Sequence, residues 1–182
     1  MNGNAHRDLK RWSIIGIAVI FALAGLWHFL YEWVPGPLTA ALCPVNESPW
    51  KHTKLFFMPA LIYFFVGRLT AGKAYPNFTF AHTAVLPLMP LLMLGIFYLL
   101  YAVGIESLAA DLVNTLIVIA FGMAVSYRLT AAAKPMAGPV YRAASLVAVL
   151  GLLVVFAVFT WFPPHSPLFQ DSNTLQYGIS LK

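Results

Sequence analysis

The chain has 182 residues, of which 60% are hydrophobic and only 9% are charged, whereas ordinary soluble domains carry about 25% charged residues. This composition excludes a soluble globular protein and predicts one membrane domain that covers residues 1–182. The net charge of +5 does not indicate a nucleic-acid partner, because the basic residues stand singly at the ends of apolar segments. The expected partners are membrane lipids, and a partner membrane protein or a homo-oligomer is left open.

Five apolar segments are each long enough to cross a hydrocarbon layer of about 30 Å as a helix. Glycine, proline and charged residues separate them. The sequence therefore predicts an all-α fold, an integral membrane bundle of five transmembrane helices at about residues 13–34, 50–70, 80–103, 108–129 and 141–162. Pro87 and Pro90 predict a kink in the third span.

Five crossings place the two termini on opposite sides of the membrane. A cytoplasmic N-terminus puts 8 of the 11 basic residues inside, as the positive-inside rule favours, namely Arg7, Lys10, Arg11, Arg68, Lys73, Arg128, Lys134 and Arg142. Lys51, Lys54 and Lys182 then lie outside, together with the C-terminal tail of residues 163–182. The tail is too rich in apolar residues for typical disorder. We expect it to rest on neighbouring loops, with a lid that brings His165 or Asp171 to the outer pocket as the alternative.

The stretch CPVNESPWKHTKLFF, residues 43–57, is the one densely polar part of the chain. Ser48 followed by Pro49 is typical of a helix start, so the second span begins inside this stretch. At the end of the first span, His28 and Glu32 are four residues apart and project from one helix face. The short connection between the two spans predicts that this face meets the polar stretch.

Two histidines and two carboxylates on adjoining helices suit Zn²⁺ or another divalent transition metal, and the predicted ligands are His28, Glu32, Glu47 and His52. A metal with three protein ligands and an open position turns its bound water into a nucleophile at neutral pH. This pattern favours a metal-dependent, membrane-embedded hydrolase acting on a lipid or small ester at the outer leaflet. Its predicted catalytic groups are Glu47, His52 and Lys54, and its predicted substrate contacts are Asn46, Ser48, Trp50 and Asp111.

The same residues also fit a role without catalysis. Glu32 would pair with Lys54 and Glu47 with Lys51, while the histidines and tryptophans would anchor the helices at the membrane interface. The alternative function is therefore a non-enzymatic accessory subunit, or a protein that binds a lipid headgroup or a partner chain. The stretch contains no H-E-x-x-H and no known nucleophile and base pattern. The cofactor, the substrate and the reaction stay open.

Three segments, HFLYEW, PVNESPWKHTKLFFMP and FPPHSPLFQDSNTLQYGI, resemble an uncharacterised family of small multi-pass prokaryotic membrane proteins with an N-E-S-x-W-x-H-x-K-L signature. The resemblance spans nearly the whole chain and implies the prokaryotic plasma (inner) membrane, but no biochemical function. It places Asn46, Glu47, Ser48, Trp50, His52 and Lys54 in the signature, together with His28 and Glu32. The family pattern has an acidic residue where this chain has Lys51. If that acid binds a metal in relatives, this chain has lost a ligand.

Overall fold

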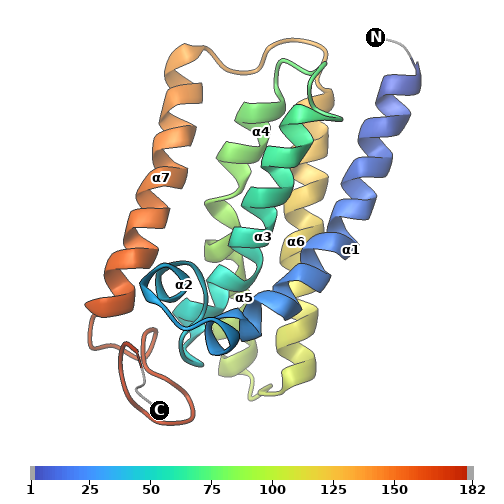
Figure 1. Cartoon of the computed structure of the whole chain (residues 1–182). Helices are drawn as coiled ribbons and strands as arrows, with labels where there is room; N and C mark the ends of the chain where they lie inside the picture. The colour runs from blue at the N-terminus through green and yellow to red at the C-terminus, as the bar shows by residue number, and fades with distance from the viewer. Residues whose placement is uncertain (1–2, 180–182) are drawn as a thin grey trace.

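The computed structural model describes residues 3–179, and each regular element in this range is an α-helix (Figure 1). The predicted all-α class is confirmed. Lys182, predicted on the outer side, lies outside the described residues. In chain order the helices are α1 (Gly3–Trp33), α2 (Pro37–Leu42), α3 (Pro49–Leu69), α4 (Phe78–Val85), α5 (Leu88–Ala102), α6 (Leu108–Ala131) and α7 (Pro139–Trp161).

Four segments are long and apolar enough to cross a membrane, as expected for a multi-pass membrane protein: Ala5–Trp33, Phe78–Ala102, Leu108–Ala131 and Pro139–Trp161. The predicted second span, α3, is not among them, so the count of five crossings is not confirmed. The polar residues of its first turns, including Lys51 and Lys54, lower its hydropathy. Ten of its 21 residues are buried within the protein, and a helix enclosed by neighbours does not need an apolar surface toward lipid.

The predicted third span consists of two helices. α4 ends at Val85 and α5 begins at Leu88, with Pro87 between them. Proline lacks the N–H that an uninterrupted helix would use, and its ring clashes with the preceding turn. The sequence predicted a kink in this span, and the structure interrupts the helix at Pro87, while α4 and α5 still follow each other as one candidate crossing.

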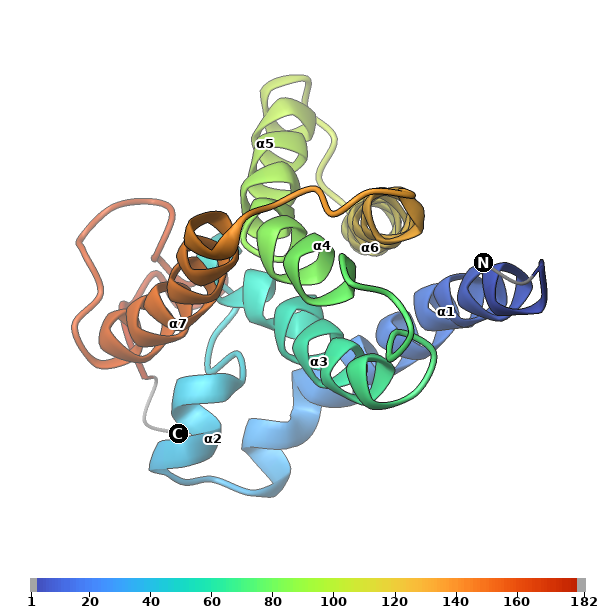
Figure 2. The ribbon, with the colours of Figure 1, turned by 90° about the horizontal axis from the view of Figure 1, so that it is seen from above.

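The long helices run alternately up and down, and α3 lies near the middle of the bundle (Figures 1 and 2). Its buried Phe56, Phe57 and Phe64 belong to the main hydrophobic core. α1 packs closely on α3, because a Cβ atom at Gly16 would lie 2.6 Å from Tyr63 Cε1. Tyr63 Oη also donates a hydrogen bond to Trp12 O over 2.8 Å. This packing holds the first half of α1 against the second half of α3.

The two ends of the bundle carry opposite charge. At the basic end, where α1 and α7 begin, lie the eight basic residues that the sequence analysis placed inside. At the acidic end, where α1 and α7 finish, lie five of the six acidic residues, namely Glu32, Glu47, Glu106, Asp111 and Asp171. Within residues 3–179, the only Lys or Arg side chains of the acidic end are Lys51 and Lys54, and both are fully buried.

The C-terminal tail folds back over the acidic end and contacts the polar stretch (Figure 1). Trp50 N donates a hydrogen bond to Leu168 O over 3.0 Å, and Asn46 Nδ2 donates one to Gly178 O over 2.8 Å. Ser172 Oγ donates to Glu47 O over 3.0 Å. The described part of the tail therefore contacts the loop before α3, which fits both the expected resting position and the lid alternative.

Candidate metal site at the acidic end

Three metal-ligating side chains converge where α1 ends and α3 begins. His28 of α1, Glu47 of the loop before α3 and His52 of α3 each offer one ligand atom, and these three atoms lie within 4.8 Å of one another. Glu47 Oε1 lies 3.6 Å from His28 Nε2, and Glu47 Oε2 lies 2.9 Å from His52 Nε2. The two imidazole ring centroids are 6.2 Å apart. We call these three residues the His–Glu–His cluster.

The start of α3 holds Glu47 and His52 in this arrangement. Ser48 is the N-cap, and its Oγ accepts a hydrogen bond from Lys51 N while Pro49 begins the helix. Asn46 Oδ1 in turn accepts hydrogen bonds from Ser48 N and Ser48 Oγ, over 3.2 and 2.9 Å. The predicted helix start is confirmed. The backbone on both sides of Glu47 is thus fixed.

Glu47 carries a negative charge at neutral pH. The hydrogen bond from His52 lowers the pKa of Glu47 and outweighs burial, which raises it; the nearby His28 lowers it further. The cluster therefore contains the ionised carboxylate that a metal ion requires.

Asp171 of the tail holds the backbone of Glu47 in place. Its Oδ2 accepts a hydrogen bond from Glu47 N over 3.0 Å, and its Oδ1 accepts from the backbone N–H groups of Asn173 and Thr174 over 2.8 Å each. Burial raises the pKa of Asp171, but these hydrogen bonds together lower it below its usual value. The sequence placed Asp171 near the pocket only in the lid alternative, since the tail is 124 residues from Glu47 along the chain.

Glu32, the fourth predicted ligand, is not part of the His–Glu–His cluster. It lies one turn beyond His28 and lines a cavity of about 830 Å³, which we call the Glu32 cavity. His28, Glu47 and Asp171 also border this cavity. The structure thus brings together three of the four predicted ligands and places the fourth beside them.

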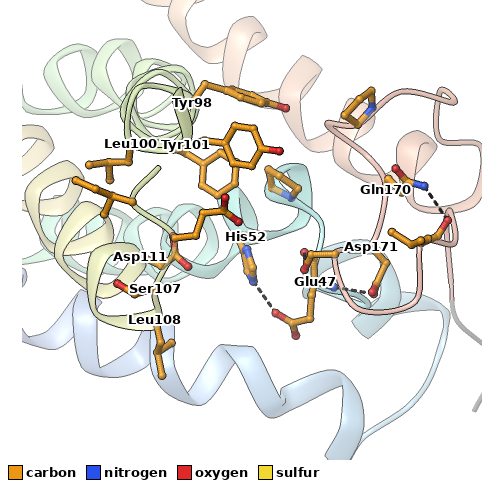
Figure 3. A pocket seen from close by; sticks show the side chains of 17 residues that line it. Glu47, His52, Tyr98, Leu100, Tyr101, Ser107, Leu108, Asp111, Gln170 and Asp171 are labelled. Carbon is orange, nitrogen blue, oxygen red and sulfur yellow. Dashed lines mark hydrogen bonds and ion pairs between the residues drawn. The ribbon is translucent and has the colours of Figure 1, made fainter. Parts of the chain in front are cut away.

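A second cavity, of about 630 Å³, opens on the other side of the cluster, and we call it the tyrosine cavity (Figure 3). Glu47 and His52 form one wall, while Tyr98 and Tyr101 of α5 form another. Asp111 of α6 also lines it. Asp111 is one of the predicted substrate contacts, and its helix α6 packs against α1, which carries His28.

The predicted substrate contacts other than Asp111 have different surroundings. Asn46 borders the Glu32 cavity, but its side chain bonds Ser48 and the tail. Ser48 is fully buried as the cap of α3. Trp50 packs against Phe156 and Phe169, and neither Ser48 nor Trp50 lines the Glu32 cavity or the tyrosine cavity. These three residues therefore build the site's scaffold.

Lys54, the third predicted catalytic group, is fully buried and lines neither cavity. Its Nζ donates hydrogen bonds to Ala41 O over 2.6 Å and to Thr160 Oγ1 over 2.8 Å. Lys51 Nζ donates to the same Thr160 Oγ1 over 2.9 Å. Both lysines thus join α3 to α7, and the predicted pairing of Glu47 with Lys51 is not found among the described residues. The side chain at position 51 points toward α7, so the departure from the family pattern removes no ligand from the His–Glu–His cluster.

Sequence reasoning missed the aromatic wall of the tyrosine cavity. Tyr98 and Tyr101 are three residues apart at the end of α5, so they share a helix face. The sequence does contain a signal for this cavity, namely two tyrosines followed within ten residues by the acidic residues Glu106 and Asp111. Aromatic residues at a membrane boundary are so common that their position alone did not indicate a binding site.

A family model described as a family of unknown function (DUF6512) matches residues 1–179. The chain belongs to this family. The predicted membership of an uncharacterised family is confirmed, whereas the signature and the prokaryotic origin stay predictions. No curated protein and no solved structure matches the chain. Any function of this DUF6512 protein must therefore follow from its own geometry.

Proposed function

We propose that this DUF6512 protein binds a divalent transition metal, best matched by Zn²⁺, through His28, Glu47 and His52, and uses it for hydrolysis at the outer membrane surface. One observation carries the proposal: three ligand atoms from three segments of the chain lie within 4.8 Å of one another. Two imidazoles and one carboxylate form a donor set of hydrolytic zinc sites, which keep a further position for water.

The second histidine is the feature that favours a metal over a structural ion pair. Glu47 needs only His52 to form a hydrogen-bonded pair, at 2.9 Å. His28 adds a second imidazole that shares the same carboxylate, at 3.6 Å. A single cation bound among two imidazole nitrogens and a carboxylate oxygen attracts all three ligands.

The neighbouring carboxylates fit hydrolytic chemistry. A bound metal would supply a water molecule that ionises near neutral pH. Asp111 lines the same cavity wall as His52, and we assign it to accept a proton or to orient the substrate (Figure 3). Glu47 and His52 act as ligands in this scheme. Lys54 has a structural role, because it lines neither cavity.

We place the site on the outer face of a prokaryotic plasma membrane, with five crossings and a cytoplasmic N-terminus. α3 has 21 residues, which as a helix extend about 32 Å, the thickness of the hydrocarbon layer. It runs through the bundle beside α1, as Figure 1 shows. The basic end supports a cytoplasmic position through the positive-inside rule.

A non-enzymatic accessory or binding protein is the competing function. It uses the polar signature as a docking surface for a partner chain. Asn46 and Trp50 are instead bonded to the chain's own tail, through Gly178 O and Leu168 O. A partner would first have to displace these contacts, and this argues for the metal site as the main role of the acidic end.

Metal analysis of the full chain tests the proposal. The protein is purified in detergent without chelators, and bound metals are measured by elemental mass spectrometry. We expect about one Zn²⁺ per chain, lost in His28→Ala and in His52→Ala. His165→Ala is the matched control, because His165 is exposed and stacks on Tyr177 in the tail. Hydrolysis of a short-chain ester should be measurable in the proteins that retain the metal and lost in the variants that lose it. Absence of metal after Zn²⁺ addition, or equal metal in all variants, overturns the proposal.

A further inference from the structure

We infer that the tyrosine cavity binds a cationic amphiphile, an alkylammonium group attached to an apolar chain. The cavity borders the His–Glu–His cluster, so the assignment of this amphiphile as the substrate class rests on the proposed function. Binding itself requires only the cavity. Its volume, about 630 Å³, lies within the range of small-molecule sites.

The charge of the cavity determines whether it favours a positively or a negatively charged ligand. Its lining contains four carboxylates, those of Glu47, Glu106, Asp111 and Asp171, and no Lys or Arg among the described residues. A divalent ion in the cluster would neutralise two of these four charges. The cavity is therefore negative with or without the metal, so it repels headgroups that carry a net negative charge and attracts cationic groups.

Two of these carboxylates accept hydrogen bonds from the protein itself. Asp171 accepts hydrogen bonds from three backbone N–H groups, those of Glu47, Asn173 and Thr174. Glu47 accepts one from His52 at 2.9 Å. A neutral amphiphile would leave this negative charge uncompensated, whereas an ammonium group compensates it.

The aromatic wall adds a preference for an alkylated ammonium. Tyr98 and Tyr101 line the cavity next to His52, and their side chains are accessible, with 41% and 58% exposure (Figure 3). Aromatic faces attract ammonium groups, and the attraction is strongest where water is excluded. Carboxylates and tyrosines around one cavity thus provide both charge and ring faces for the cation.

The apolar part of the ligand also has a place in the cavity. Leu100, Ile105 and Leu108 contribute to the lining between the end of α5 and the start of α6. Leu108 is 75% exposed, and it lies at the start of a helix that is apolar enough to cross the membrane. A hydrocarbon chain can therefore extend from the cavity along these residues toward lipid while the ammonium stays among the carboxylates.

Binding of water-soluble probes to the full chain tests the inference. The protein is treated with EDTA and kept in an uncharged detergent, and saturation-transfer NMR measures binding of hexyltrimethylammonium, hexyl glucoside and hexyl sulfate. The variant Glu106→Gln with Asp111→Asn removes two charges from the cavity. Glu32→Gln is the matched control, because Glu32 lines the other cavity. Competition by dihexanoylphosphatidylcholine distinguishes a lipid headgroup from a soluble amine as the source of the ammonium.

We expect hexyltrimethylammonium to bind at least about tenfold more tightly than hexyl sulfate or hexyl glucoside. The double variant should lose this preference, and Glu32→Gln should keep it. Competition by the short lipid assigns the ammonium to a headgroup, and lack of competition assigns it to a soluble amine. Equal binding of hexyl sulfate, or ammonium binding that survives in the double variant, overturns the inference. These results do not depend on the metal, so failure of metal binding and failure of ammonium binding are separate outcomes.

Discussion

Glu47 and His52, five residues apart, form a 2.9 Å contact between Oε2 and Nε2 across the first turn of α3. The contact closes because Ser48 caps the helix between them, so Glu47 stays outside the helix and turns back over it. The opposite oxygen of Glu47 faces His28. A single carboxylate thus joins α1 to α3, and this geometry has consequences that do not require a metal.

The first prediction concerns pH and stability of the metal-free protein. Because the pKa of Glu47 is lowered in the folded state from its ordinary value of 4.5, its ionised form stabilises the fold. This stabilisation is fully present above about pH 4.5 and is lost as the pH falls through the folded-state pKa. The thermal midpoint of the wild type should exceed that of Glu47→Gln at pH 7, and the difference should shrink as the pH falls from 4.5 through the folded-state pKa. A constant difference across this range would contradict the prediction.

The second prediction concerns Asp171 as a positioning residue. Asp171→Asn weakens the acceptor for Glu47 N and removes a negative charge behind the cluster. Groups that orient metal ligands typically contribute 10- to 100-fold to affinity, so we expect Zn²⁺ binding to weaken by about tenfold in calorimetric titration.

Asn173→Ala is the control for this measurement. Asn173 reaches Asp171 through its backbone N–H, which the substitution retains. Its Zn²⁺ affinity should match that of the wild type. Equal affinity in Asp171→Asn would show that the tail does not position Glu47.

Part of this site was predictable because it depends on neighbouring turns. His28 lies near the end of one apolar segment, and Glu47 and His52 flank the start of the next helix, so a short connection brings them together. The exclusion of Glu32 was not predictable. Glu32 shares a helix face with His28, and only the angle between α1 and α3 decides which of the two reaches the cluster.

The long-range contacts could not be predicted from the sequence for a related reason. The motif spacing of Lys54 does not tell whether its side chain points to water or to the interior. In the structure it reaches Thr160, 106 residues later in the chain. Tyr98, Glu106 and Asp171 likewise join one cavity from three different segments. Periodicity identifies helix faces but does not specify which faces meet.

The third prediction separates the two buried lysines. Lys54 Nζ donates hydrogen bonds to Thr160 Oγ1 and to three backbone carbonyls at the C-terminal end of α2, so Lys54→Met leaves buried acceptors without a donor. We expect it to lower the free energy of unfolding by about 1–3 kcal/mol. Lys51→Met removes one hydrogen bond and one of two amines at the same oxygen. It should change the free energy of unfolding by less than about 1 kcal/mol.

Chemical unfolding in detergent measures both lysine variants. Metal content serves as a second readout, since both variants should keep the His–Glu–His cluster intact. Equal destabilisation by Lys51→Met and Lys54→Met would contradict the conclusion that, of the two lysines, only Lys54 anchors α2.

The last prediction tests whether α3 is a fifth crossing. Burial raises the pKa of Cys43 to about 11, although Lys54 opposes the shift, and Cys43 is only 1% exposed. The native thiol should therefore be inert to maleimides, because the thiolate is the reactive form. New cysteines at exposed positions can then be labelled in the wild-type background. Ser172→Cys reports the acidic end, and Thr70→Cys reports the basic end after α3.

In intact cells, a membrane-impermeant maleimide should label Ser172→Cys and leave Thr70→Cys unlabelled until the membrane is opened. We expect this outcome because α3 runs the full length of the bundle between the polar stretch and Arg68, and the proposed five crossings place its two ends on opposite sides of the membrane. Labelling of both cysteines in intact cells would place both ends of α3 on one side and remove it from the crossings. Labelling of Thr70→Cys alone would invert the topology and place the His–Glu–His cluster in the cytoplasm.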